Sequence, residues 1–254
     1  MALPDTEVAI LGGGCAGLSL AARLADIGIN ATVIEPRERY EDDRTWSFWR
    51  TRPDPFEDCV RARWSAWRVS HGGARVSRRS GRIRYESVSA GRFYDKALGR
   101  AGHAPDIALA LGHRVTGEPA RDLCDGLWRT ETTAGRIASR HVVDTRPPGG
   151  PPGYGQYFEG HEVALEDGRL DPSEVGLMEF TAPRPDRVDF VYVLPFARDR
   201  ALIEATSFAP APPAAGELSA WLDAAVAARA GRGRVETLRE ERGFIPMQAS
   251  GLSG

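Results

Sequence analysis

Three glycines and one glutamate near the start of the chain have the types and the spacing of a dinucleotide site. Gly12, Gly14 and Gly17 form the pattern Gly-x-Gly-x-x-Gly, and Glu35 follows 18 residues after the last glycine. The first glycine allows a tight turn, the second lets a pyrophosphate approach, and the third lets a helix pack closely on a strand. An acid at the position of Glu35 accepts hydrogen bonds from ribose hydroxyls. The spacing predicts a dinucleotide site without distinguishing FAD from NAD.

A second candidate group is a carboxyl in the segment RALIEATSF, residues 200–208. Strand alternation places Glu204 on one face with Leu202, Thr206 and Phe208. A carboxyl buried among apolar groups has a raised pKa and stays protonated near neutral pH, as a general acid requires. The alternative is that this face looks outward and Glu204 is an ordinary surface residue. Glu179, in GLMEFT, is a second candidate acid, and a structural hydrogen bond is an equal alternative for it.

Aromatic rings gather in the segment DDRTWSFW, residues 42–49. The rings of Trp46, Phe48 and Trp49 can line an apolar tunnel, and an aromatic face stabilises a nearby cation. The alternative is that these rings only fill the junction between two domains. We expect some rings to pack and others to face flavin or substrate, in a segment that crosses the boundary between cofactor and substrate.

The elements that must position these residues are of two kinds. A strand, a helix and a second strand are expected at 7–11, 15–28 and 31–35, which is a βαβ unit. Alternating runs after a connection rich in Pro and Gly predict an antiparallel sheet and then a helix. The further expected elements are a helix at 91–101, strands at 127–133, 139–145, 156–165, 176–181, 188–196 and 200–208, and a helix at 217–230.

This order predicts an α/β protein with a Rossmann-like dinucleotide-binding domain. The position of the glycine pattern at the start of the chain resembles two-domain flavoproteins, which implies a Rossmann-like FAD-binding domain and an interleaved antiparallel β-sheet substrate domain. The first domain is expected mainly in residues 1–150 and the second mainly in residues 151–254. The strands at 127–133 and 139–145 are expected to return to the nucleotide-binding layer.

Composition narrows the function classes. With 254 residues and a net charge of −2, the chain has no general electrostatic reason to bind nucleic acid. Cys15, Cys59 and Cys124 are too far apart for a disulfide framework or a Cys-x-x-Cys site, and we predict no metal. No apolar run is long enough to cross a bilayer. We therefore expect a cytoplasmic protein whose membrane contact is at most peripheral.

The glycine pattern, Glu35 and the segment Arg44-Thr45-Trp46-Ser47-Phe48 together resemble the bacterial lycopene beta-cyclase family. Further segments agree with that family in order and approximate spacing, so that the resemblance covers nearly the whole chain. They are VVDTRPP at 142–148, GQYFEGHEV at 155–163, GLMEFT at 176–181, FVYVLPFARDRALIEATSF at 190–208 and REERGFIPM at 239–247.

This resemblance implies a flavoprotein that closes the linear ends of lycopene into beta-ionone rings. It implies reduced FAD, with NAD(P)H as the reductant and no net redox change. It places the family's proposed catalytic glutamate at Glu204, and we assign Arg44 to the cofactor site with Gly12, Gly14, Gly17 and Glu35. The substrate-binding residues expected are Trp46, Phe48, Trp49 and Phe208.

The chain departs from the family pattern at two points, and two rival functions stay open. Ala205 follows Glu204 where the family usually has a second acid, and the family continues past the I-P-M segment into further flavin-contacting segments, so a C-terminally truncated member is expected. One rival is a flavin monooxygenase or reductase of the same fold. Asp144-Thr145-Arg146 disfavours hydroxylation, because such hydroxylases usually have Asp-Gly there. The other rival is a non-catalytic remnant.

Overall fold

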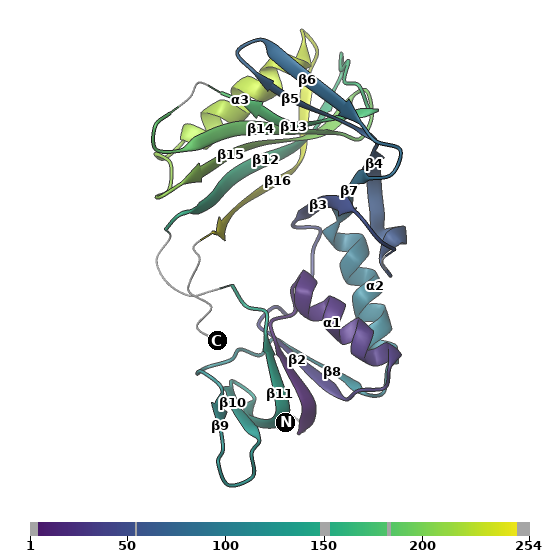
Figure 1. Ribbon diagram of the computed structural model, residues 1–254, viewed down its shortest axis with the longest axis vertical. Coiled ribbons are helices and arrows are strands. Elements are labelled where there is room, and N and C mark those ends of the chain that lie inside the picture. The colour runs from purple at the N-terminus through teal and green to yellow at the C-terminus, as the bar shows by residue number, and fades with distance from the viewer. Residues whose placement is uncertain (1–4, 54, 148–152, 182–183, 248–254) are drawn as a thin grey trace. The chain divides into compact units, whose positions relative to one another are not determined.

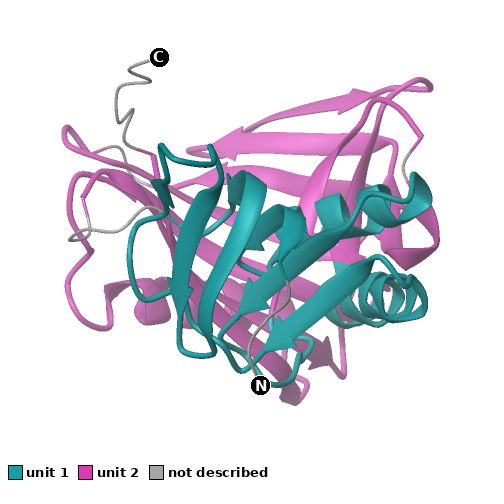
Figure 2. Ribbon diagram, turned by 90° about the horizontal axis from the view of Figure 1, so that it is seen from below, with its two compact units in different colours: residues 1–43, 89–147 teal, residues 44–88, 148–254 magenta. Residues whose placement is uncertain are grey.

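The chain forms two compact units, and each is discontinuous in sequence. The computed structural model describes residues 5–53, 55–147, 153–181 and 184–247 (Figure 1). Unit 1 comprises Met1–Asp43 and Ser89–Pro147, and unit 2 comprises Arg44–Val88 and Pro148–Gly254 (Figure 2). The chain therefore leaves unit 1 within the DDRTWSFW segment, and residues 44–88 belong with the second half of the chain.

Unit 1 contains a six-stranded sheet in the order β8-β2-β1-β11-β10-β9, with two helices. Strands β8, β2, β1 and β11 are parallel, and β10 pairs antiparallel with both β11 and β9. The elements are β1 (Thr6–Leu11), α1 (Cys15–Asp26), β2 (Ala31–Glu35), α2 (Ala90–His103), β8 (Ile107–Leu111), β9 (Ala120–Arg121), β10 (Trp128–Thr132) and β11 (Gly135–Asp144).

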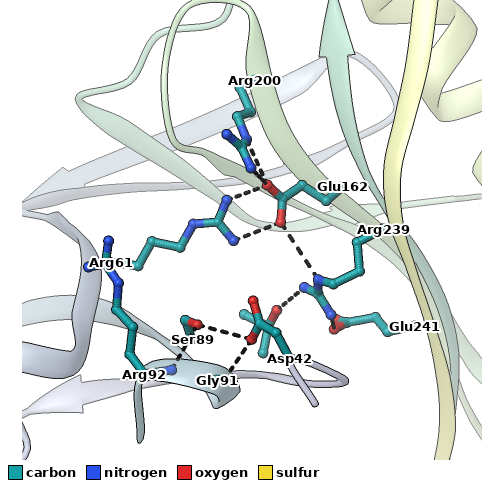
Figure 3. A network of polar contacts seen from close by, with 10 residues as sticks. Asp42, Arg61, Ser89, Gly91, Arg92, Glu162, Arg200, Arg239 and Glu241 are labelled. Atoms are coloured by element: carbon teal, nitrogen blue, oxygen red, sulfur yellow. Dashed lines mark hydrogen bonds and ion pairs between the residues drawn. The ribbon is translucent and has the colours of Figure 1, made fainter. Parts of the chain in front are cut away.

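Both helices of unit 1 have a local reason to form where they do. Helix α1 buries small side chains such as Ala21 and Ala22 against the strands, which lets its backbone lie close to the sheet. Helix α2 begins after Ser89, whose side chain accepts a hydrogen bond from the backbone N–H of Arg92. The Asp42 carboxylate accepts from the backbone N–H of Gly91 at 2.9 Å (Figure 3). An acid at this position complements the positive end of the helix dipole.

Unit 2 is built on a seven-stranded sheet in the order β16-β12-β15-β14-β13-β5-β6, with helix α3 along one face (Figure 1). Neighbouring strands are antiparallel except β13 and β5, which are parallel. The elements are β5 (Ala66–His71), β6 (Ala74–Arg79), β12 (Gly155–Leu165), β13 (Glu174–Phe180), β14 (Val188–Pro195), β15 (Arg200–Ala209), α3 (Glu217–Ala230) and β16 (Val235–Pro246).

Besides the seven-stranded sheet, the structure has a three-stranded sheet in the order β3-β7-β4. Its strands are β3 (Thr45–Arg50), β4 (Val60–Trp64) and β7 (Arg84–Ser89), and a short 3₁₀ helix, η1 (Glu57–Cys59), precedes β4. Trp64 of β4 is 1% exposed, and its indole N–H donates to the carbonyl of Pro195 at 3.2 Å. This bond ties the small sheet to the end of β14.

Different groups of side chains pack on the two faces of the seven-stranded sheet. On the α3 face, Ile203 and Ala205 of β15 pack with Leu222 of the helix in the main core of the unit. On the opposite face, Leu202 packs with Trp64 and Tyr85. We call this second face the Glu204 face, because Glu204 alternates with Ile203 and Ala205 and so shares the side of Leu202.

The α/β fold class expected from the sequence is confirmed, as are the βαβ unit, the helices at α2 and α3 and the return of β11 to the parallel layer. The antiparallel pairing expected among β12, β13, β14 and β15 is also present. The seven-stranded sheet of unit 2 is mixed, however, because β13 pairs in parallel with β5. Strand β5 lies in a segment in which we predicted no strand.

Candidate functional site

The glycine-rich turn after β1 has the geometry that its pattern predicts. Gly12 has a φ of 99°, a left-handed conformation that favours glycine. A Cβ on Gly17 would overlap the carbonyl oxygen of Gly12, so close helix-strand contact requires a glycine there. A Cβ on Gly14 would meet nothing within 4 Å. The turn thus leaves space beside Gly14 at the N-terminus of α1, where free N–H groups and the helix dipole favour a phosphate.

Glu35 is buried beneath this turn and fixes its shape. It is 5% exposed, and its carboxylate accepts from the backbone N–H of Gly13 at 2.6 Å and from Arg37 Nε at 2.7 Å. Burial alone would raise the pKa of Glu35, but the hydrogen bonds from Arg37 and Gly13 outweigh it, and the pKa is lowered. The carboxylate is therefore charged at neutral pH. The structure describes three hydrogen bonds to it, and a carboxylate offers about four acceptor positions, which leaves room for a further donor such as a ribose hydroxyl.

Arg37 and Tyr40 complete the support of this turn, and sequence reasoning missed both. Arg37 lies over the Tyr40 ring, 4.4 Å from its centroid, and the Tyr40 hydroxyl donates to the carbonyl of Gly13 at 2.8 Å. Their position directly after the acid that ends β2 was the available signal. Arg44, predicted for the cofactor site, is an exposed residue after this segment, and its role stays a prediction.

Glu204 lies mostly buried in the middle of β15, with part of its surface still accessible. Burial, which removes hydration from the charged form, and the nearby carboxylate of Glu241 together raise the pKa of Glu204 to about 8. The Thr206 hydroxyl, which donates to Glu204 Oε1 at 2.9 Å, acts in the opposite direction. The group therefore holds its proton at neutral pH, which is the condition for a general acid.

Aromatic side chains lie on the strand that pairs with β15 at Glu204. Tyr192 of β14 lies directly opposite Glu204 in the register, and the Phe190 ring is 4.9 Å from the Tyr192 ring. Phe208, predicted as a substrate residue, packs against Phe190 with ring centroids 5.5 Å apart. Burial and the neighbouring Glu204 raise the pKa of Tyr192 to about 12, so this ring stays a neutral phenol.

Two rings of the DDRTWSFW segment pack within unit 2, and the expectation that others face flavin or substrate stays a prediction. Trp49 packs against Trp67 at 4.7 Å and Tyr85 at 5.0 Å between centroids, and Phe48 lies under the Arg50 guanidinium at 4.9 Å. Phe48 and Trp49 remain 38% and 37% exposed. Burial raises the pKa of Tyr85, and the neighbouring Tyr192 and Glu204 contribute to the increase. Trp49 therefore contacts Tyr85, which interacts with Glu204. Trp46 is partly exposed on the same strand.

Glu179 has a different environment from Glu204. It lies opposite Val191, a residue of the α3 core, so it belongs to the other face of the sheet. Its carboxylate pairs with Arg229 of α3 and with Arg68 at 2.8 Å. Burial raises its pKa, but the two arginines outweigh burial and the pKa is lowered. This arrangement favours the structural alternative that the sequence left open for Glu179.

A buried glutamate with three arginines lies on the same face as Glu204. Glu162 has a side chain that is 3% exposed, and it pairs with Arg61, with Arg200 at 2.5 Å and with Arg239 at 3.7 Å (Figure 3). Despite burial, Arg61 and Arg200 lower the pKa of Glu162. Sequence reasoning missed this cluster, because the arginines around Glu162 come from three distant segments.

Within the described residues, no three His, Cys, Asp or Glu side chains lie close enough to hold a metal ion. Across the same residues, no helix is long and apolar enough to cross a membrane.

Comparisons with known proteins bear on the family and the fold of this chain. The family model described as "Lycopene cyclase protein" matches residues 7–254. A chloroplastic lycopene beta cyclase from an Oncidium hybrid cultivar is 26% identical in an alignment of 241 positions that covers 82% of this chain and 48% of that protein. The chain thus spans about half the length of this curated relative.

Solved structures show the same fold at low identity. A geranylgeranyl bacteriochlorophyll reductase-like protein from Thermoplasma acidophilum superposes with a TM-score of 0.69 at 12% identity, over 97% of this chain and 68% of that one. The flavin-dependent monooxygenase PieE, solved with FAD and substrate, has a TM-score of 0.69 at 12% identity, over 95% and 49%. The p-nitrophenol 4-monooxygenase PnpA from Pseudomonas putida has a TM-score of 0.64 at 15% identity, over 96% and 69%. The fold is that of the α/β flavin enzymes.

Proposed function

The chain belongs to the lycopene cyclase family, and from that premise we propose that it closes the linear ends of lycopene into beta-ionone rings by acid catalysis. The observation that carries this proposal is Glu204, a buried carboxyl that stays protonated at neutral pH among aromatic rings. The fold alone does not select this reaction, because monooxygenases and reductases share it.

Ring closure needs one proton and returns one. Glu204 would give its proton to the terminal double bond of the polyene, and the neighbouring double bond would then close the ring on the resulting carbocation. The new cation loses a different hydrogen as a proton, so that substrate and product are isomers. Tyr192 and Tyr85 offer aromatic faces to the cation, and their high pKa values keep them neutral and poor as nucleophiles.

The residues of unit 1 fit an FAD. The open space beside Gly14 and the N-terminus of α1 would hold the pyrophosphate, and Glu35 would accept a ribose hydroxyl. When bound in its reduced form, the flavin supplies an electron-rich ring that stabilises positive charge, with no net electron transfer. We propose NAD(P)H as the reductant. Because lycopene dissolves in membranes, we also propose a cytoplasmic protein with peripheral membrane contact.

The direct test of this function is a product assay with the purified chain, reduced FAD and lycopene in liposomes. Chromatography should show carotenes with beta rings and the mass of lycopene. Unchanged lycopene with FAD-loaded protein would contradict the proposal, and a product that differs from lycopene by two hydrogens would indicate a reductase.

Gly14→Val should weaken FAD binding at least about tenfold, a loss of about 1.4 kcal/mol, because the branched side chain would fill the space for the pyrophosphate. Titration with FAD, followed by quenching of flavin fluorescence, measures this change. Gly99→Val is the matched control, since Gly99 lies on α2 of the same unit with nothing within 4 Å of its Cβ position. Equal affinities in the two variants would remove Gly14 from the site.

Glu179→Gln should leave the rate of ring formation within about threefold and should lower the free energy of unfolding by about 1–3 kcal/mol, because Arg68 and Arg229 lose their shared anion. Urea unfolding and the pigment assay measure the two effects separately. A variant that unfolds like the wild type and forms no rings would instead make Glu179 the acid.

A further inference from the structure

A glycine separates two glutamates across the middle of the Glu204 face. Gly160 of β12 pairs with Glu204 of β15 on one side and with Glu241 of β16 on the other. A Cβ on Gly160 would lie 3.3 Å from Glu204 Cβ and 3.3 Å from Glu241 Cγ. The absence of a side chain on the central strand therefore lets the two carboxyl groups meet across it.

The two carboxyl groups share a hydrogen bond, and they have different partners. The Glu241 side chain is 6% exposed and pairs with Arg239 at 2.6 Å. Glu204 instead accepts from the neutral Thr206 hydroxyl at 2.9 Å. A cation bonded to one carboxyl of a close pair favours negative charge on that carboxyl, so that the shared proton stays on the other. Arg239 is itself held by Glu162 and by the Thr45 hydroxyl.

We infer that Glu241 is the positioning residue that keeps the transferable proton on Glu204, through a carboxyl–carboxylate pair formed across Gly160. This inference rests on the proposed role of Glu204 as the acid. Glu241 does not deliver a proton to the substrate. Its negative charge makes ionisation of Glu204 costly, and the carboxylate left after proton donation is driven to take up a proton again.

The groups that face Glu204 come from three strands besides its own, and each must be considered in a titration. They are Tyr192 from β14, Tyr85 from β7, Arg239 and Glu241 from β16, and Thr206 on β15 itself. The two tyrosines stay neutral below their raised pKa values, and the arginine stays charged. Within this set Glu241 is therefore the group whose charge holds the proton on Glu204.

Infrared difference spectroscopy of the purified chain measures the protonation of Glu204 directly, because a protonated carboxyl has its own C=O stretch. The band assigned to Glu204 by its loss in Glu204→Gln should disappear as pH rises. In Glu241→Gln its midpoint should move down by about one pH unit or more, because the like charge is gone. Glu240→Gln, on the same strand but exposed, should leave the midpoint unchanged.

Two further variants keep the test decisive if Glu241→Gln does not fold. Glu241→Asp retains the charge and should move the midpoint less than Gln does. Gly160→Ala should move it in the same direction as Gln, because the new Cβ presses the two side chains apart. An unmoved midpoint in the folded variants would overturn the inference and leave Glu204 as the acid. A midpoint that moves as expected in a protein that forms no rings would support the pairing and contradict the proposed function.

Discussion

Glu204→Gln should abolish ring formation while the protein still folds and binds FAD. Gln has the size of Glu and keeps the hydrogen bond from Thr206, but it has no proton to give. Loss of a general acid typically lowers a rate about a hundredfold to ten-thousandfold. The measurement is the initial rate of cyclic carotene formation, with FAD affinity and the unfolding transition determined on the same preparation.

The pH dependence of the wild type gives this prediction a second readout. The active form of Glu204 is protonated, so the rate should be highest below its raised pKa and should fall as the pH rises through about 8. An acid with an ordinary glutamate pKa of about 4.3 would lose activity much lower on the pH scale. A Glu204→Gln variant with the wild-type rate would remove this residue from the chemistry.

Glu162→Ala should lower the free energy of unfolding by about 3 kcal/mol, because removing one partner leaves a partly buried group of cations without their anion. The effect stays below the largest known for buried pairs, since the Arg200 side chain is 47% exposed and can reach water. Urea unfolding followed by tryptophan fluorescence measures the difference at pH 7.

The pH dependence of this difference has a definite sign. Because the folded-state pKa of Glu162 is lowered, its stabilisation is present above the ordinary glutamate range and is lost as the pH falls below about 4. The wild type and Glu162→Ala should therefore converge in acid. Glu240→Ala, at an exposed position on β16, should change stability by less than about 0.5 kcal/mol. If Glu162→Ala behaved like this control, the network in Figure 3 would not stabilise the fold.

The elements predicted correctly are those whose signals are local. The buried strand β1, the glycine turn and helix α1 follow one another within about one supersecondary unit, and alternation along β15 correctly placed Glu204 with Leu202. The strands within residues 44–88 were not predicted, because β5 pairs in parallel with β13, which lies far along the chain. Such pairing depends on tertiary packing and leaves little trace in a short window of sequence.

The same distinction applies within the candidate site. Glu204 could be selected from its own neighbours, but Glu241 lies in the charged run REER, which reads as a solvated edge strand. Its proximity to Glu204 depends on the register of β16 and β15 on either side of Gly160. The position of Glu179 on the opposite face likewise follows from an irregular pairing of β13 with β14, which alternation in one strand does not reveal.

The most direct test of the account is a single turnover in D₂O. The protein is equilibrated in D₂O with reduced FAD, mixed with lycopene and quenched, and the carotenes are separated and analysed by mass spectrometry. If the exchangeable proton of Glu204 starts the reaction, each ring formed should carry one deuterium, and Glu204→Gln should form no rings. Rings of unchanged mass, or deuterated rings formed at the wild-type rate by Glu204→Gln, would contradict the assignment of Glu204 as the acid.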